Sequence, residues 1–391
     1  MKVSATGFTR DEIAVLRCLL YPYQVELSSR AEGSDLVICA DDLSASSKPM
    51  IRVPKRRDPR GGYQALRSHG NGVVDLPFDL VGWCSGKFEA AMNPKVALIY
   101  RLIVTLPFRY TIFPSSIRST FLSLHEPDKS LSDHLAMEVA RKILIEAFDM
   151  IGFHLQRKNP PSLLITHDIE TERGLRKALS LKAIEDHLDV CSMWFLPSHE
   201  YPIPRGIAEE LADGSSIGSH DIRHDGRLIL IQSHDQLVQR TRASKVKLEE
   251  IFRKEVTSFR APLLQSNRRI LASLERAGYG FDFSFPCWEP VHPVTGRGFG
   301  VELLQEFRID GVVEIPLTLF QDHQVLNVLR MNTREATRFW CEQAKLVRSF
   351  GGDIVLLVHP DYSFSLHLDR YKELLQSLLE IQMRAPICSW A

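Results

Sequence analysis

After about position 160, short apolar runs alternate with longer stretches of helical spacing. The apolar runs are continuous, which is typical of strands buried on both faces. Seven strands are predicted, at residues 163–165, 191–196, 216–219, 258–260, 281–283, 312–315 and 354–358. Six helices are predicted with them, at residues 175–188, 207–213, 234–254, 267–277, 334–349 and 368–382. Repeated strand–helix units predict an α/β fold, and six or seven of them favour a distorted (β/α) barrel over two small sheets.

The first part of the chain has a different pattern and predicts a separate, smaller α/β domain. Helices are expected over residues 11–21, 80–92 and 131–151, a strand over 36–40, and a polar, turn-rich segment over 44–62. No group of residues in this part carries recognisable chemistry. Residues 156–161 are polar and end in two prolines, which indicates a boundary. We therefore expect an N-terminal domain of unknown role over 1–155 and the barrel over 156–391.

Charge and apolar content exclude several classes of protein. Acidic and basic side chains balance at 48 each, so no strong field would draw the chain to nucleic acid. The most apolar later segment, 96–113, is interrupted by Arg101, Pro107 and Arg109, which excludes a membrane-spanning helix of about 20 apolar residues. The first residues lack the apolar core of a secretory signal, and seven scattered cysteines predict neither a disulfide framework nor a zinc knuckle. We expect no transmembrane segment and a reducing, cytoplasmic location.

The strand at 163–165 leads into two acidic residues, Asp168 and Glu170. The carboxyl ends of strands are where active sites lie in parallel sheets and α/β barrels. Because the two residues are two positions apart, an extended backbone points both carboxylates to one side. The alternative is a solvated loop whose acids favour the start of the following helix.

A pair of histidines follows the strand at 216–219. His220 and His224 are four residues apart, a spacing that stacks two imidazoles on one face of a helical turn and allows them to bind one divalent cation. Two histidines and one carboxylate leave coordination positions open for water and substrate, as a hydrolytic metal needs. The alternative is two surface histidines in a loop.

Three further motifs lie at or beyond later strands. Arg260 ends a strand two residues before Pro262, where its guanidinium could orient a catalytic carboxylate and keep it ionised. Asp282 lies in an aromatic strand followed by Trp288, and such aromatic rings are either core or platforms for sugars. His359 follows the most apolar strand, where it could give a proton to a departing amine. Each residue taken alone is also compatible with a structural or surface role.

The order of these five motifs resembles the polysaccharide deacetylases of the NodB-homology class, carbohydrate esterase family 4. The resemblance covers roughly residues 163–367. It implies a distorted (β/α) barrel that binds one divalent metal ion, usually zinc, and removes acetyl groups from N-acetylated sugars.

The resemblance also implies roles for individual residues. Asp168 matches the general base, His220 and His224 the metal-binding pair, Arg260 the partner of the base, and His359 the general acid. Asp282 is a weaker match to the acid that tunes that histidine. Trp288, and Pro262 with it, match the substrate groove.

The chain departs from the family pattern at two positions. Family members commonly have two adjacent aspartates, base then metal ligand, whereas Asp168 is followed here by Ile169. Either Glu170 binds the metal while Asp168 is the base, or Asp168 binds the metal and the base role shifts. Asp221 replaces the usual serine or threonine after the first histidine and adds negative charge near the cation.

The sequence therefore predicts a metal-dependent hydrolase that acts on the amide of an N-acetylated saccharide. One alternative is a C–N hydrolase that acts on a small cyclic amide without metal. Another is a barrel that has lost catalysis and serves as a binding or scaffold protein, because Ile169 interrupts the first motif.

Overall fold

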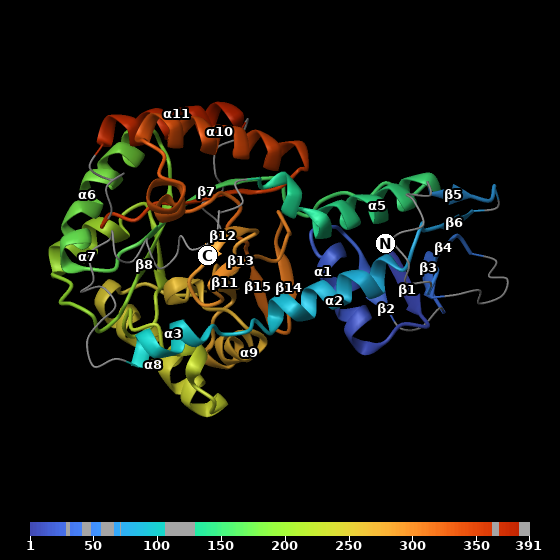
Figure 1. Cartoon of the computed structure of the whole chain (residues 1–391), viewed down its shortest axis with the longest axis horizontal. Helices are drawn as coiled ribbons and strands as arrows, with labels where there is room; N and C mark the ends of the chain where they lie inside the picture. Colours follow the sequence, from blue (N-terminus) through green and yellow to red (C-terminus); the bar gives the residue numbers. More distant parts are fainter. Residues whose placement is uncertain are drawn as a thin grey trace. The chain divides into compact units, whose positions relative to one another are not determined.

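The computed structural model describes residues 1–28, 32–40, 48–55, 66–70, 72–105, 130–361 and 367–382. These residues form two compact units (Figure 1). The first unit comprises Met1–Ala91, Leu135–Pro160 and Glu306–Ile309, and the second comprises the remaining segments. Both units are therefore discontinuous in sequence, whereas the sequence analysis places a single boundary near residue 155. That division into 1–155 and 156–391 stays a prediction.

The first unit is built on a mostly parallel sheet. Its strands are β1 (Lys2–Thr6), β2 (Glu26–Ser28), β3 (Leu36–Ala40), β4 (Met50–Val53), β5 (Arg67–Ser68) and β6 (Val73–Asp75), in the order β2-β1-β3-β4-β6-β5. Only the β5–β6 pair is antiparallel among the pairs of this sheet. The helices are α1 (Arg10–Leu20), α2 (Leu80–Met92) and α5 (Ala136–Met150), and a short strand, β14 (Phe307–Ile309), also belongs to this unit. The turn-rich segment predicted over 44–62 lies partly outside the described residues.

The second unit contains the predicted parallel sheet. Its strands are β7 (Leu163–Asp168), β8 (Ser192–Leu196), β9 (Ser216–Ser219), β10 (Ser258–Phe259), β11 (Phe281–Asp282), β15 (Val312–Glu314) and β16 (Ile354–Leu357). They lie in the order β15-β11-β10-β9-β8-β7-β16, and every neighbouring pair is parallel. All residues of β8 and β16 are buried, as their continuous apolar sequences predict. The predicted α/β fold with a curled, barrel-like sheet is confirmed.

Helices lie around the outside of these strands in Figure 1. They are α3 (Leu98–Thr105), α6 (Glu172–His187), α7 (Arg205–Ala212), α8 (His234–Phe252), α9 (Arg268–Ala277), α10 (Thr333–Ser349) and α11 (Leu368–Ile381). Four of them begin at a residue whose side chain accepts a hydrogen bond from the first turn: Thr171, Ser233, Asn267 and Asn332. These caps fix where each loop ends, and so fix the loops at the carboxyl edge of the sheet.

The sequence analysis missed the small elements that follow β11. A hairpin of β12 (Glu289–His292) and β13 (Arg297–Phe299) is antiparallel, and a π-helical turn spans Gln324–Val328. Both are too short for hydrophobic periodicity to reveal.

The described residues bear on the expectations for membrane spans and cysteines. Among these residues, no helix combines the length and the hydrophobicity needed to cross a bilayer. Cys18, Cys39, Cys84, Cys287 and Cys341 are not disulfide-bonded, whereas Cys191 is. The absence of a disulfide framework and the cytoplasmic location stay predictions.

Candidate metal centre and active site

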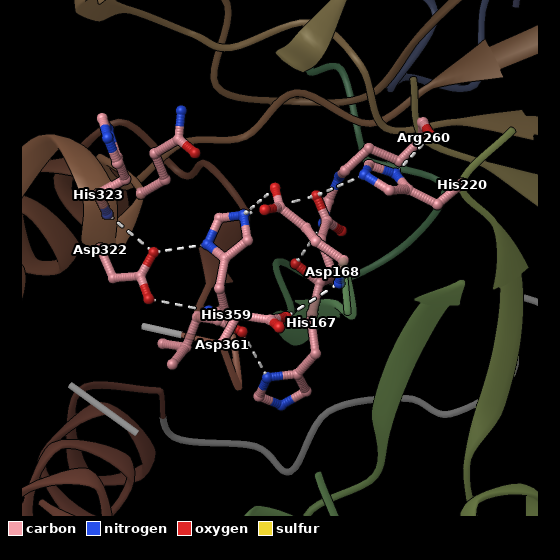
Figure 2. Close-up of polar contacts among 12 residues, drawn as sticks. His167, Asp168, His220, Arg260, Asp322, His323, His359 and Asp361 are labelled. Atoms are coloured by element: carbon pink, nitrogen blue, oxygen red, sulfur yellow. Dashed lines mark hydrogen bonds and ion pairs between the residues drawn. The ribbon is translucent and has the colours of Figure 1, made fainter. Parts of the chain in front are cut away.

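Residues at the carboxyl ends of four parallel strands meet in one place. Asp168 is the last residue of β7, His220 and Arg260 directly follow β9 and β10, and His359 lies two residues beyond β16. His359 Nε2 lies 3.9 Å from Asp168 Oδ2 and 3.8 Å from Glu170 Oε1 (Figure 2). His220 Nε2 is also 3.9 Å from Asp168 Oδ2. Segments that are almost 200 residues apart in sequence therefore form one buried cluster of titratable groups.

Three side chains of this cluster form a potential metal site. Glu170, His220 and His224 each offer one ligand atom, and these atoms lie within 4.8 Å of one another. His224 Nε2 is 3.0 Å from Glu170 Oε1. Two imidazole nitrogens and one carboxylate oxygen are a common ligand set for a catalytic divalent ion such as zinc, and they leave a position for water or substrate.

The hydrogen bonds of His220 fit a metal ligand. Its Nδ1 donates to the backbone carbonyl of Arg260 over 2.9 Å, so the proton resides on Nδ1. Its Nε2 is buried and has no hydrogen-bond partner among the described residues. Burial lowers the pKa of His220 to about 4, against the opposing charge of Asp168, so the ring is neutral at pH 7. A neutral imidazole with a buried, unshared lone pair fits a metal ion.

The loop that carries Glu170 is held through its backbone. Asp361 Oδ2 accepts a hydrogen bond of 2.9 Å from the Glu170 amide, and Oδ1 accepts one from the Thr171 hydroxyl. The Tyr201 hydroxyl donates to the carbonyl of Ile169 over 2.6 Å. The Ile169 side chain is fully buried in the core. The interrupted first motif thus points its isoleucine into the core, and Glu170 is the carboxylate that belongs to the potential metal cluster.

Asp168 is ionised and oriented by Arg260. Arg260 Nη1 donates to Asp168 Oδ1 over 3.0 Å and to Thr166 Oγ1 over 2.9 Å, and its Nε donates to the Phe283 carbonyl over 3.0 Å. Burial alone would raise the pKa of Asp168, but the positive charges of Arg260 and the neighbouring histidines outweigh it and lower the pKa. The guanidinium also lies over the Phe195 ring, 4.5 Å from its centroid. Arg260 therefore holds one oxygen of Asp168 and leaves Oδ2 directed at the cluster.

Asp322, rather than Asp282, contacts His359. Asp322 Oδ1 lies 2.6 Å from His359 Nδ1, and Oδ2 accepts a hydrogen bond of 2.8 Å from the His359 amide (Figure 2). Burial lowers the pKa of His359, but the Asp322 carboxylate outweighs burial and raises it to about 10. The expectation that Asp282 tunes this histidine is corrected accordingly.

Asp282 forms a carboxyl pair with Glu314 instead. The two residues are register partners on β11 and β15, and both are fully buried. Ser284 Oγ donates to Asp282 Oδ1 over 2.6 Å, and the Phe285 amide donates to Glu314 Oε1 over 3.0 Å. Burial raises the pKa of Asp282 to about 6, and burial and the charge of Asp282 raise the pKa of Glu314 well above its ordinary value. Burial therefore favours the protonated form of both carboxyl groups.

Trp288 and Pro262 are the two residues predicted to bind substrate. The Trp288 ring stacks on His134 with centroids 3.5 Å apart, which covers one face of the indole. Pro262 is buried in a tight turn whose next two residues, Leu263 and Leu264, have φ of 58° and 51°. Left-handed backbone at a non-glycine residue is strained, and such strain clusters at ligand sites. Substrate binding by Trp288 and Pro262 stays a prediction.

Asp221 does not direct its charge at the cation site. Arg240 Nη2 and Nε bind its two carboxylate oxygens at 2.7 to 2.9 Å, and Arg240 also binds Asp225. This ion pair neutralises the negative charge that the sequence analysis assigned to the neighbourhood of the metal.

Glu289 is a buried carboxyl group for which the sequence showed no signal. It lies on β12 with no exposed surface, and Gln321 Nε2 donates to its Oε2 over 3.0 Å. Burial raises the pKa of Glu289 from 4.5 to about 8, although the hydrogen bond from Gln321 opposes the shift. The folded protein therefore binds this proton more tightly than the unfolded chain does.

This shift predicts a pH-dependent stability. Because the folded-state pKa is raised, the stabilisation is complete below the unfolded pKa and is lost as the pH rises toward about 8. In Glu289→Gln, we expect the decrease in unfolding free energy between pH 5 and pH 8 to shrink by at least about 1 kcal/mol, the equivalent of roughly one pKa unit. Denaturant titrations at both pH values measure it. The control, Glu342→Gln, alters a carboxylate that is 66% exposed and should keep the wild-type pH dependence. If the unfolding free energy of Glu289→Gln fell between pH 5 and pH 8 by as much as that of the wild type, the raised pKa of Glu289 would be contradicted.

Comparison with known proteins finds neither a matching family model nor a matching curated protein. The chain is similar to solved structures named as carbohydrate esterase family 4 members or deacetylases. They include a family pseudoenzyme from Bacillus anthracis, with 14% identity, 57% of this chain and 62% of that chain covered, and a TM-score of 0.39. A family 4 carbohydrate esterase from Streptomyces lividans in complex with acetate has 12% identity, 59% and 99% coverage, and a TM-score of 0.38.

A mutant of peptidoglycan deacetylase from Bacillus subtilis has 12% identity, 57% and 85% coverage, and a TM-score of 0.38. The chain spans less than two thirds of the length of the Bacillus anthracis pseudoenzyme. Because the identities are low, the chemistry of the site is deduced from the side chains of this chain.

Proposed function

We propose that the protein is a metal-dependent hydrolase that removes an acyl group, acetyl in the simplest case, from the nitrogen of an N-acylated sugar or polysaccharide precursor. The observation that carries this proposal is the convergence of Glu170, His220 and His224 with two further titratable groups, Asp168 and His359. A metal site alone binds a cation. A metal site flanked by an oriented base and an oriented acid has the groups that amide hydrolysis needs.

Asp168 is assigned as the general base and Glu170 as the carboxylate ligand. Asp168 Oδ1 is occupied by Arg260, whereas Oδ2 faces the two histidines, where it can take a proton from the attacking water. Glu170 is 3.0 Å from His224 and shares the three-residue cluster, of which Asp168 is not a member. A divalent ion held by this cluster supplies Lewis acidity, which polarises the amide carbonyl and makes water more acidic.

His359 is assigned as the general acid. Asp322 fixes its Nδ1, so Nε2 points into the cluster toward Asp168 and Glu170 (Figure 2). Amide cleavage breaks the C–N bond, and the nitrogen must receive a proton before it leaves. His359 Nε2 donates that proton while Asp322 stabilises the protonated ring. The products are a carboxylic acid and a free amine.

The assignment of a sugar substrate is supported by the resemblance of the five motifs to polysaccharide deacetylases. The aromatic residue Trp288 is consistent with a sugar platform, although His134 covers one of its faces. We also propose zinc as the metal and an N-acetylated saccharide as the substrate.

Chelation provides the direct test. Treatment with a chelator is expected to abolish acetate release from N-acetylated saccharides, and readdition of zinc should restore it, because the three-residue cluster is the proposed metal site. Elemental analysis of the purified protein, combined with a screen for acetate release, measures both parts. Activity that survives chelation would instead favour a C–N hydrolase acting on a cyclic amide. Stoichiometric metal uptake without release of any acyl group would favour a binding or scaffold protein.

A further inference from the structure

A buried histidine outside the proposed ligand set links the two strands that carry the base and the acid. His167 has no exposed surface and directly precedes Asp168. Its Nδ1 donates to the backbone carbonyl of Val358 over 2.7 Å, and Val358 directly precedes His359 (Figure 2). The side chain directly before the proposed base therefore forms a hydrogen bond to the backbone of the residue directly before the proposed acid.

This bond lies where the backbone pairing of the two strands ends. The last paired residues are Thr166 on β7 and Leu357 on β16, followed by a hydrogen bond of 3.1 Å from the Val358 amide to the Thr166 carbonyl. Beyond this point the strands diverge into the loops of the site. The imidazole of His167 supplies the next link between them.

The other side of the ring is anchored in the core. His167 Nε2 lies 2.7 Å from Glu185 Oε1, a carboxylate on α6. Glu185 also accepts hydrogen bonds from the Tyr371 hydroxyl on α11 and, over 2.6 Å, from Ser192 Oγ on β8. The ring stacks on Trp194 with centroids 4.1 Å apart. Because both nitrogens face acceptors and one face is covered, the ring is held in a single orientation.

We propose that His167 is a positioning residue of the hydrolytic site, whose Nδ1 bond to Val358 holds His359 within reach of Asp168 and Glu170. Glu185, Ser192 and Tyr371 hold the ring in the orientation that makes this bond. This inference rests on the proposed function, which it deepens. It assigns different tasks to the two ring nitrogens: Nδ1 sets the geometry of the site, and Nε2 contributes to stability through its buried contact with Glu185.

Two substitutions separate the two tasks. The amide nitrogen of asparagine is at the same branch position as Nδ1, and that of glutamine is at the position of Nε2. His167→Asn therefore keeps the bond to Val358 and loses Glu185, whereas His167→Gln keeps Glu185 and loses Val358. We expect kcat to stay within about tenfold of wild type in the asparagine variant and to fall about 100-fold in the glutamine variant, because a displacement of about 1 Å has that cost. KM and zinc content should change little in either variant.

Stability should rank in the opposite order. His167→Asn leaves the buried Glu185 carboxylate without its hydrogen bond from residue 167, so its thermal midpoint should be the lower of the two. The control, Glu138→Gln, breaks a buried ion pair, with Arg141 at 2.8 Å, and should lower the midpoint without changing kcat. A merely structural role for His167 predicts that turnover follows stability. Equal losses of kcat in both variants, or the same ranking for kcat and midpoint, would overturn the proposal.

Crystal structures of the two variants give a readout that needs no activity. The distances from His359 Nε2 to Glu170 Oε1 and Asp168 Oδ2, 3.8 and 3.9 Å, should persist in His167→Asn and lengthen in His167→Gln. If the wild-type protein hydrolyses no acylated sugar, the proposed function fails, but these distances still decide whether His167 positions His359. Unchanged distances in both variants would contradict the positioning role whatever the substrate.

Discussion

Alanine at both His220 and His224 is expected to abolish metal binding and acyl hydrolysis together. The two imidazoles are two of the three members of the cluster that could hold the ion. Loss of an outer partner of a metal ligand commonly costs about 10 to 100-fold in affinity or activity, and loss of two ligands should cost far more. Elemental analysis and acetate release, measured on the same preparation, report the two effects.

A matched control separates loss of the metal from loss of any histidine. His154 belongs to the first unit, and its side chain is 82% exposed. His154→Ala should therefore keep the wild-type metal content and turnover. A purified His220→Ala/His224→Ala protein with full activity would show that the proposed metal role is wrong.

The second large effect is expected for Asp322→Asn, in which kcat should fall by about 10² to 10⁴-fold, the usual contribution of an acid or base. The carboxylate binds His359 through both Nδ1 and the backbone amide. An amide at this position can donate to Nδ1, which stabilises the wrong tautomer and removes the charge that supports the protonated ring. Zinc content should be unchanged, because Asp322 is not a member of the metal cluster. Steady-state kinetics with parallel metal analysis measure the effect.

Asp353→Asn is the corresponding control for loss of a buried carboxylate. Asp353 accepts hydrogen bonds from the Ser162 amide and hydroxyl at 2.8 and 3.1 Å. It directly precedes β16, at the end of the strand opposite to His359. This variant should lose stability and keep kcat. An Asp322→Asn enzyme with near wild-type kcat would exclude the proposed support of His359.

The strands and the groups directly after them could be predicted because local sequence determines both. A continuous apolar run marks β16, and His359 follows it within two residues. The same reasoning located Asp168 and His220. In each case the parallel sheet brings the strand ends to one edge, so no knowledge of distant contacts was needed.

Asp322 could not be found in this way. It follows no strand directly, and its contact with His359 joins residues 37 positions apart. Asp282 was assigned the role because the family resemblance implies it, but its register partner is another acid, Glu314. The sequence pattern shows that an acid lies at the end of a strand. Which residue that acid contacts depends on cross-strand register and loop conformation.

The organisation of the first unit was also only partly predictable. Its helices follow apolar periodicity, but Met92–His134 belongs to the second unit although both flanking segments belong to the first. The sequence gives no local sign that this segment belongs to the second unit. Apolar periodicity indicates that a helix packs against a core, but not which core.

The attachment of Glu170 through its amide has a consequence for engineering. Tyr201 and Asp361 bind the two ends of the peptide group that joins Ile169 to Glu170, and Asp361 also accepts a hydrogen bond from the Thr171 hydroxyl. These three hydrogen bonds hold the loop without using the Glu170 side chain, so we expect other ligand side chains at position 170 to leave the path of the loop unchanged. Since softer and harder ligands favour different ions, exchanging Glu170 for cysteine, histidine or aspartate is expected to change which divalent ion the proposed site binds.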